Sequence, residues 1–315
     1  MERKHYLDWL RVLSTISILS IHTSGYFEGK HGTISEIFYS LFTYLFIWGV
    51  PAFVMLSGAL WVDRKIATKK LFEKYILHII VAYIFWSFFY AITNPFDDIK
   101  TFFVRWIFGH YHLWFCYMIV GLYIVLPIVW KVAQERVCFL YLLFLSFCIT
   151  ICVPTLLQIP ALSFLSNIWE NTGIYMGYGY IFYFLLGYFF SKSDISKRKE
   201  IFFYIIGALG VTAQMYGAEI SDFHLFRLGL VCAVFTLCKN HLNRRCKPIS
   251  AISKRCFGIY LIHPLILDLL NLARIWQTDL FAVGNRIIVI TITFVASLFL
   301  TTIISKIPRV GKWLV

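Results

Sequence analysis

The sequence predicts an all-α protein, a polytopic membrane bundle of about ten transmembrane helices with both termini in the cytoplasm. Of its 315 residues, 60% are hydrophobic and 14% are charged, whereas an ordinary soluble domain has roughly 25% charged residues. Its mean hydropathy is +0.75. Apolar stretches recur along the whole chain without a polar linker between them, so we expect one integral-membrane domain over residues 1–315.

Each expected helix is an apolar stretch near the length of about 20 residues that crosses a bilayer. Basic residues precede the first one, as in a signal peptide, but no small-residue cleavage site follows it, so we expect it to remain attached. The ten stretches are Leu7–Ser24, Ile37–Trp61, Tyr75–Thr93, His112–Trp130, Val137–Leu157, Gly173–Phe190, Ile201–Gly217, Phe226–Cys238, Cys256–Leu272 and Arg286–Ile304.

The distribution of charge sets the expected orientation. The net charge is +13, and most of the 29 lysine and arginine residues fall at the two termini and in alternate loops. Because cytoplasmic loops carry such an excess of basic residues, both termini are expected inside the cell. The basic balance therefore reflects topology rather than nucleic-acid binding. Part of it can also bind an anionic ligand or membrane lipid headgroups.

The eight cysteines do not indicate a metal site or a disulfide framework. The chain has no C-x-x-C motif with a matching pair of histidines or cysteines, which a structural zinc site would require. We interpret the cysteines as small packing residues, and we expect no metal.

Arg11 and His22 lie within the first apolar stretch, and both are costly inside a bilayer, so they are candidate functional residues. Eleven residues separate them. In a helix that spacing leaves about 20° between their directions and about 16 Å between their heights. With the N-terminus in the cytoplasm, Arg11 is expected near the inner face and His22 near the outer one.

Several motifs, in order along the chain, resemble one family. Arg11 and His22 reproduce the R-x10-H signature of the bacterial membrane acyltransferase type-three family, and Phe53, Ser57 and Gly58 match its aromatic-x-x-S-G segment. Further similar stretches are YHLWFCYMIVGLYIVLP from Tyr111, YIFYFLLGYFF at Tyr180–Phe190 and CFGIYLIHPL at Cys256–Leu265. The resemblance implies an integral-membrane enzyme of a bacterial inner or plasma membrane that acylates, usually O-acetylates, cell-surface sugars. The chain looks most like the short, single-domain members.

Acetyl-CoA is the acyl donor that this resemblance implies. Its phosphates are expected to bind Arg11, Lys69, Lys70, Lys74 and His78 on the cytoplasmic side, because arginine and lysine are the usual partners of phosphate. The family commonly has an Arg-x-x-Arg pair in this segment, where the chain reads KKLFEKYILH. Lysine lacks the bidentate contact of a guanidinium, so the charge is retained but the forked geometry is not.

His22 is suited to two catalytic roles, as a base for an incoming hydroxyl group or as a transient acyl carrier, and we favour the base. Ser57 either donates to the thioester oxygen or lets two helices approach closely. The simpler alternative is that His22 is a buried histidine bonded to a neighbour such as Ser57, while Arg11 extends to the interface near Asp8.

The acceptor is expected to be a glycan or a lipid-linked sugar bound at the outer side. His112, Trp114 and Tyr117 begin the fourth stretch there and are candidate acceptor-site residues, although aromatic residues at that depth also form interfacial belts. His263 is assigned a supporting role in acceptor binding. Asp268, five residues later, points about 140° away from it on a helix.

The sequence thus favours a membrane O-acyltransferase that moves an acetyl group from cytoplasmic acetyl-CoA to a hydroxyl group of a cell-surface or lipid-linked glycan. The alternative is a carrier for a small anionic or amino-acid-like solute, without covalent chemistry. Carriers often contain inverted repeats, and the two halves show no convincing repeat. A lipid-sugar flippase or a polymerase accessory is a third possibility that no motif specifically supports.

Overall fold

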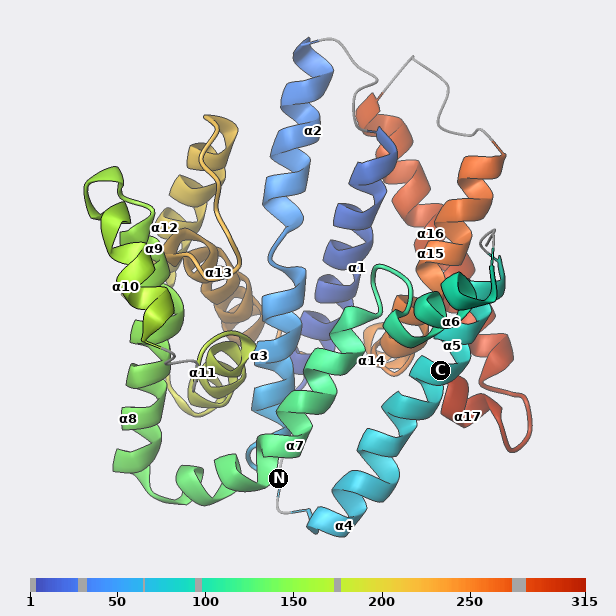
Figure 1. Ribbon diagram of the computed structural model, residues 1–315, viewed down its shortest axis with the longest axis horizontal. Helices are drawn as coiled ribbons and strands as arrows, with labels where there is room; N and C mark the ends of the chain where they lie inside the picture. The colour runs from blue at the N-terminus through green and yellow to red at the C-terminus, as the bar shows by residue number, and fades with distance from the viewer. Residues whose placement is uncertain (1–3, 28–32, 65, 94–97, 173–176, 274–281) are drawn as a thin grey trace.

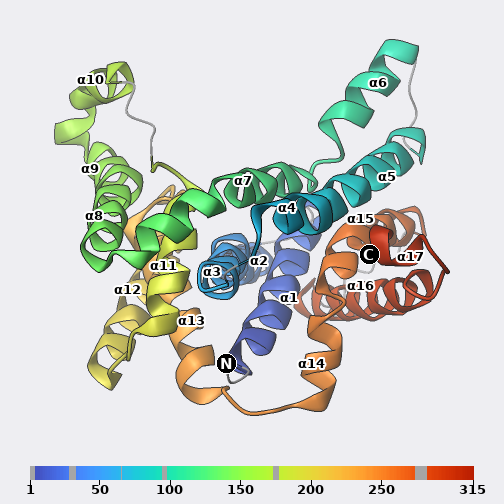
Figure 2. The same ribbon diagram turned by 90° about the horizontal axis from the view of Figure 1, so that it is seen from below.

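The computed structural model describes residues 4–27, 33–64, 66–93, 98–172, 177–273 and 282–315, and every regular element in these ranges is helical. Figure 1 shows α1, α2 and α3 in the middle, with α8 to α13 on one side and α14 to α17 on the other. The view from below in Figure 2 shows the same division, with α4 to α7 crossing one side of the central helices.

The helices follow one another with short connections. In chain order they are α1 (Tyr6–Phe27), α2 (Thr33–Phe46), α3 (Gly49–Trp61), α4 (Thr68–Lys70), the π-helical turn η1 (Leu71–Ile76), α5 (Leu77–Thr93), α6 (Ile99–Phe108), α7 (Trp114–Gln134), α8 (Arg136–Phe147), the π-helical turn η2 (Cys148–Cys152), α9 (Val153–Leu157), the 3-10 turn η3 (Pro160–Leu165), α10 (Ser166–Asn171), α11 (Tyr180–Lys192), α12 (Lys197–Met215), α13 (Leu225–His241), α14 (Lys247–Ser253), α15 (Cys256–Leu272), α16 (Ala282–Ile304) and α17 (Gly311–Leu314).

All ten predicted stretches contain helix, but ten membrane spans are not confirmed. By length and apolarity, five helical runs in the described ranges can cross a membrane, or six if the bent pair α14 and α15 forms one span. The other predicted spans include helices that are too short, since α11 has 13 residues and α13 has 17. The first residues of the stretch predicted from Gly173 lie outside the described ranges. The cytoplasmic position of the termini stays a prediction.

The predicted span Ile37–Trp61 is divided between α2 and α3. Pro51 lies in the first turn of α3, where its missing N–H costs little. At the break between the two helices, the Phe46 carbonyl accepts a hydrogen bond from the Ser17 hydroxyl of α1. A side chain on Gly49 would collide with Ser17. The break thus lets α1 approach the junction closely, and hydropathy alone does not reveal it.

Helices α3 and α11 cross in close contact at two glycines. A Cβ atom on Gly58 would overlap the carbonyl oxygen of Phe184, and a Cβ atom on Gly187 would overlap that of Met55. Small residues allow this backbone approach between membrane helices. The structure therefore gives Gly58 of the S-G motif a packing role, and it brings α11 against the helix that contains Ser57.

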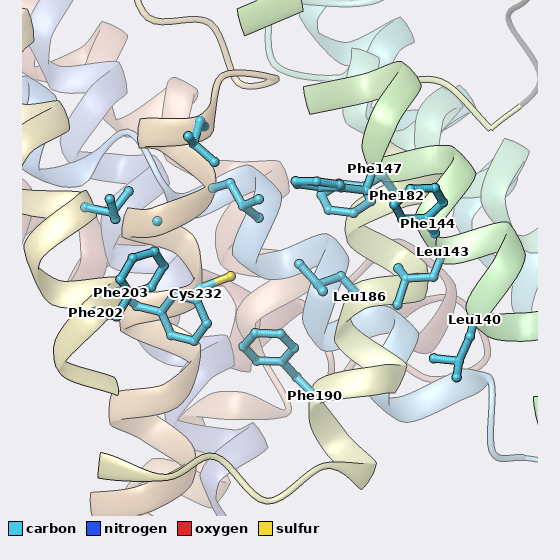
Figure 3. Close-up of a pocket in the computed structure, with 14 residues that line it drawn as sticks. Leu140, Leu143, Phe144, Phe147, Phe182, Leu186, Phe190, Phe202, Phe203 and Cys232 are labelled. Atoms are coloured by element: carbon cyan, nitrogen blue, oxygen red, sulfur yellow. The ribbon is translucent and has the colours of Figure 1, made fainter. Parts of the chain in front are cut away.

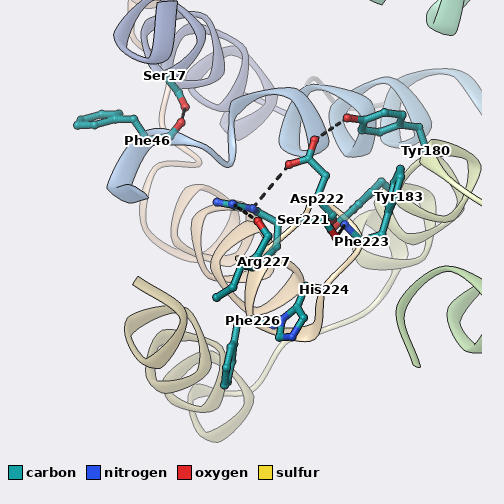
Figure 4. Close-up of polar contacts among 11 residues, drawn as sticks. Ser17, Phe46, Tyr180, Tyr183, Ser221, Asp222, Phe223, His224, Phe226 and Arg227 are labelled. Carbon is teal, nitrogen blue, oxygen red and sulfur yellow. Dashed lines mark hydrogen bonds and ion pairs between the residues drawn. The ribbon is translucent and has the colours of Figure 1, made fainter. Parts of the chain in front are cut away.

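An ion pair between a buried arginine and a partly exposed aspartate links α13 to the loop before it, at the end of the bundle that is expected to face outward. Arg227 is 2% exposed, and its Nε lies 3.6 Å from Oδ1 of Asp222. The hydroxyl of Tyr180 donates to Oδ2 of Asp222 over 2.5 Å, and the hydroxyl of Tyr183 donates to the Asp222 backbone carbonyl (Figure 4). Burial raises the pKa of Asp222, while the bond from Tyr180 and the charge of Arg227 oppose that rise.

An apolar groove of about 530 Å³ separates α8 from α12 and α13, with α11 beside it (Figure 3). Its lining includes Phe144, Phe182, Phe190 and Phe202, and it contains no charged side chain. The groove therefore offers no charged partner for the phosphates of an acyl donor.

Candidate active site

A basic cavity of about 770 Å³ lies at the N-terminal end of α1. Five basic side chains and two acidic ones line it, which gives an excess of positive charge suited to a polyanionic ligand. The lining residues are Lys4, Leu7, Asp8, Arg11, Ala59, Leu60, Asp63, Arg64, Lys192, Asn243 and Lys254.

Arg11 is placed in this cavity by a contact with α14. Its Nη1 donates to the hydroxyl of Ser253 over 3.0 Å. The Ser253 hydroxyl in turn donates to Oδ1 of Asp8 over 2.9 Å, and Ser250 donates to Oδ2 of Asp8 over 2.8 Å. A guanidinium has five N–H donors, so the bond to Ser253 leaves others for a ligand. Ser253 thus links the Arg11 guanidinium to the Asp8 carboxylate.

Two lysines, Lys4 and Lys192, add positive charge to the cavity. Lys4 donates to the Ser191 carbonyl over 3.1 Å, and Lys192 pairs with Asp63 over 2.7 Å. Burial and the nearby charge of Lys192 lower the pKa of Lys4, while Asp63 partly opposes this shift. A bound anion would favour the charged form of Lys4, so the cavity gains electrostatic complementarity when an anion enters it.

The lysines predicted to bind the donor lie outside the lining of this cavity. Lys69, Lys70 and Lys74 are exposed on α4 and η1; Lys69 is near Glu73 at 3.8 Å, and Lys74 lies over the ring of Tyr75. His78 contacts the rings of Phe257 and Trp313. The structure brings Arg11 together with Lys4, Arg64, Lys192 and Lys254 instead. Sequence reasoning missed all four. Arg64, Lys192 and Lys254 come from segments far from Arg11 in the sequence, whereas Lys4 directly precedes the helix that contains Arg11.

The opposite end of α1 carries His22 into a cluster of histidines. The ring centroid of His22 lies 5.2 Å from that of His263 on α15 and 5.0 Å from that of Tyr111. The ring centroid of His263 lies 5.3 Å from that of His112. His112 and His263 are buried, with exposed fractions of 1% and 0%. Three residues predicted separately as catalytic or acceptor-binding are thus neighbours.

Further residues complete this cluster, and sequence reasoning missed them. His110 approaches His112 with their Nδ1 atoms 3.2 Å apart, and it stacks on Tyr90 with centroids 4.6 Å apart. The hydroxyl of Tyr260 donates to the carbonyl of His112. Tyr260 precedes His263 by three residues, so helical spacing could have placed it on the same face. His110 lies outside regular helix, and its spacing alone gave no such signal.

Arg286, near the start of α16, forms a hydrogen bond with the helix that contains His22. It is 3% exposed, and its Nη2 lies 3.2 Å from the carbonyl of Ser20 and 3.2 Å from Oγ1 of Thr43. Its guanidinium carbon also lies 4.3 Å from the ring centroid of Phe42. These contacts join α16 to α2 and to α1, where Ser20 lies two residues before His22.

Ser57, Trp114 and Tyr117 have other contacts. The Ser57 hydroxyl donates to the carbonyl of Phe53 over 3.0 Å within α3. Trp114 is 42% exposed, with its ring 5.8 Å from that of Tyr180, and Tyr117 donates to the Tyr83 hydroxyl over 2.5 Å. Their predicted roles stay predictions. Among the described residues, no group of three or more His, Cys, Asp or Glu side chains is arranged to hold a metal ion.

Comparison with known families decides the class of the protein. Residues 4–306 match the profile of a family described as an acyltransferase domain, the acyltransferase 3 family. The chain belongs to this family. The suspected resemblance is confirmed, and the protein is a membrane acyltransferase in general terms. Comparison with curated proteins gave no match, and comparison with solved structures gave none either.

Within this acyltransferase 3 protein, the two ends of α1 differ in chemistry. The Arg11 end opens into a basic cavity, and the His22 end meets His263 and Tyr111. An acyltransferase must bind an activated acyl donor and deprotonate an acceptor. A basic cavity and an imidazole suit these two tasks.

Proposed function

We propose that this protein is an O-acetyltransferase that moves an acetyl group from cytoplasmic acetyl-CoA to a hydroxyl group of a cell-surface or lipid-linked glycan. The observation that carries the proposal is the position of Arg11 and His22 on one helix, with Arg11 in a basic cavity and His22 in a histidine cluster. Membership of an acyltransferase family supports acyl transfer as the reaction class.

The donor enters with its phosphates among Arg11, Lys4, Arg64, Lys192 and Lys254. Arginine and lysine are the usual partners of phosphate groups, and all five side chains line the cavity. Its pantetheine arm then follows α1 toward His22. The helical rise between Arg11 and His22 is about 16 Å, a length on the scale of that arm, so the thioester reaches the histidine cluster.

His22 acts as the general base. Its imidazole takes the proton of the acceptor hydroxyl as the oxygen attacks the thioester carbonyl carbon. The tetrahedral intermediate collapses by breaking the carbon–sulfur bond, and the proton passes to the leaving thiolate. Acetyl-CoA and an alcohol thus give an acetyl ester and CoA, with no net change in protons. A neutral imidazole can accept this proton and then return it to the leaving group.

The proposal is tested by supplying acetyl-CoA to purified protein in lipid together with oligosaccharides of glucose, galactose, rhamnose and N-acetylglucosamine. We expect release of free CoA and an equal amount of an alkali-labile acetyl ester on one of the glycans. Solute counterflow without any consumption of acetyl-CoA would instead identify the protein as a carrier. In that case no covalent role of His22 would remain.

Arg11→Lys is expected to weaken acetyl-CoA binding by about tenfold, because an ammonium group cannot replace a bidentate guanidinium contact. The measurement is the Kd for acetyl-CoA by isothermal titration in lipid nanodiscs. Lys70→Gln is the matched control, since Lys70 is exposed and does not line the cavity.

The same titration distinguishes the two candidate donor sites. Lys254→Gln should weaken binding in the way that Arg11→Lys does, whereas Lys70→Gln should leave the Kd unchanged. The opposite pattern would return the phosphate site to α4 and η1, where Lys69, Lys70 and Lys74 lie.

A further inference from the structure

Pro264 sets the orientation of the His263 ring. A proline inside a helix lacks the N–H that would bond the carbonyl four residues earlier, and for Pro264 that carbonyl belongs to Tyr260. Nδ1 of His263 lies 2.7 Å from this carbonyl oxygen. In α15, Pro264 therefore leaves the Tyr260 carbonyl without a backbone donor, and the His263 side chain donates to that carbonyl instead.

This contact also determines which ring nitrogen carries the proton. A carbonyl oxygen can only accept a hydrogen bond, so Nδ1 of His263 must be the donor. In the neutral ring Nε2 is then an unprotonated acceptor. Nε2 is buried and has no hydrogen-bond partner among the described residues, and the whole residue is 0% exposed. An unsatisfied buried polar atom is costly, which indicates that a donor from a ligand completes the site.

His22 and His263 cannot both accept from the same hydroxyl group, because a hydroxyl has one proton. Their ring centroids are 5.2 Å apart, so a substrate bound at His22 lies next to His263. The proposed function assigns the reacting hydroxyl to His22. The second acceptor then requires a second donor next to it.

We infer that the acceptor sugar carries a second hydrogen-bond donor adjacent to the hydroxyl that is acetylated, as in a vicinal diol, and that Nε2 of His263 binds it. This inference rests on the proposed function. It makes His263 a substrate contact that selects diols over isolated alcohols, while His22 remains the base. The ring of His112 also contacts the His263 ring edge-on, at a centroid distance of 5.3 Å.

Two substitutions separate substrate contact from a purely structural role. His263→Asn keeps a donor near Nδ1 for the Tyr260 carbonyl but removes the acceptor at Nε2. His263→Gln places an acceptor oxygen near Nε2 and loses the Nδ1 contact. If Nε2 binds substrate, His263→Asn raises the KM for the glycan about threefold to tenfold, the value of one hydrogen bond. His263→Gln then has a KM closer to that of wild type. If His263 only satisfies the carbonyl, Asn behaves as wild type and Gln does not, which would overturn the inference.

Competition by small alcohols tests the diol directly. Trans-1,2-cyclohexanediol and cyclohexanol are added as inhibitors of glycan acetylation. The diol should inhibit wild type about threefold to tenfold more strongly, and His263→Asn should abolish that difference. Equal inhibition of wild type by the two alcohols would overturn the inference. Wild type that acetylates no glycan would refute the proposed function instead.

Nitrogen NMR of protein labelled at histidine reports the tautomer without any acceptor. The signals lost in His263→Asn should show a protonated Nδ1 and an unprotonated Nε2. Pro264→Ala restores a backbone N–H to the Tyr260 carbonyl and should weaken this preference. A protonated Nε2 on His263 in wild type would contradict the proposed contact.

Discussion

Replacing His22 by alanine should lower the rate of acetyl transfer by roughly 100-fold to 10,000-fold, the range for loss of a general base. Acetyl-CoA binding should remain, because the donor cavity is formed at the other end of α1. The measurement is the initial rate of ester formation at saturating acetyl-CoA, beside the Kd for the donor. His241→Gln is a suitable control, since this histidine pairs with Glu200 at 2.6 Å on α12 and lies outside the cluster.

Full activity in the His22→Ala protein would exclude His22 as the base. An acetyl group trapped on His22 when wild type receives acetyl-CoA without an acceptor would instead assign it the role of acyl carrier. Mass spectrometry of the peptide that contains His22 distinguishes these outcomes.

Gly187→Ala should destabilise the protein strongly, by about 3 kcal/mol, the upper end for overpacking. The new Cβ would overlap the Met55 carbonyl oxygen, a backbone atom that cannot rotate away, so α3 and α11 must separate. The measurement is the thermal unfolding midpoint of the purified protein in detergent.

Gly121→Ala is the matched control for this substitution. A Cβ atom on Gly121 in α7 would meet nothing within 4 Å, and alanine is the better helix former by about 0.5–1 kcal/mol. Its midpoint should therefore equal or exceed that of wild type. Equal midpoints for Gly187→Ala and Gly121→Ala would show that α3 and α11 do not cross as closely as described.

Hydropathy predicted where the helices lie, because helices that cross a membrane consist of long apolar stretches that are visible in the sequence. The stretch Cys256–Leu272 coincides with α15, and Arg286–Ile304 with most of α16. The break between α2 and α3 could not be predicted in this way, because it depends on Ser17 of α1 reaching the Phe46 carbonyl. Such contacts between helices have no counterpart in a local apolar pattern.

The candidate site was predictable where it depends on helical periodicity. The spacing of Arg11 and His22 was sufficient to place them on one face at different heights. Three partners of Arg11 in the cavity, Arg64, Lys192 and Lys254, were not predictable, since they belong to distant segments. The sequence predicted a phosphate site on α4 and η1 instead, because Lys69, Lys70 and Lys74 lie where the family commonly has an Arg-x-x-Arg pair. Only tertiary structure shows which basic residues share the cavity with Arg11.

The most direct test of the proposed mechanism asks whether donor and acceptor act from opposite sides of the membrane. The protein is reconstituted into sealed vesicles with acetyl-CoA inside and the glycan acceptor outside, since neither crosses the bilayer. Arg11 in the basic cavity and His22 in the histidine cluster mark the two ends of the expected route. We predict that acetyl ester forms on the external glycan while CoA stays inside. Ester formation only when both compounds share one compartment would contradict it.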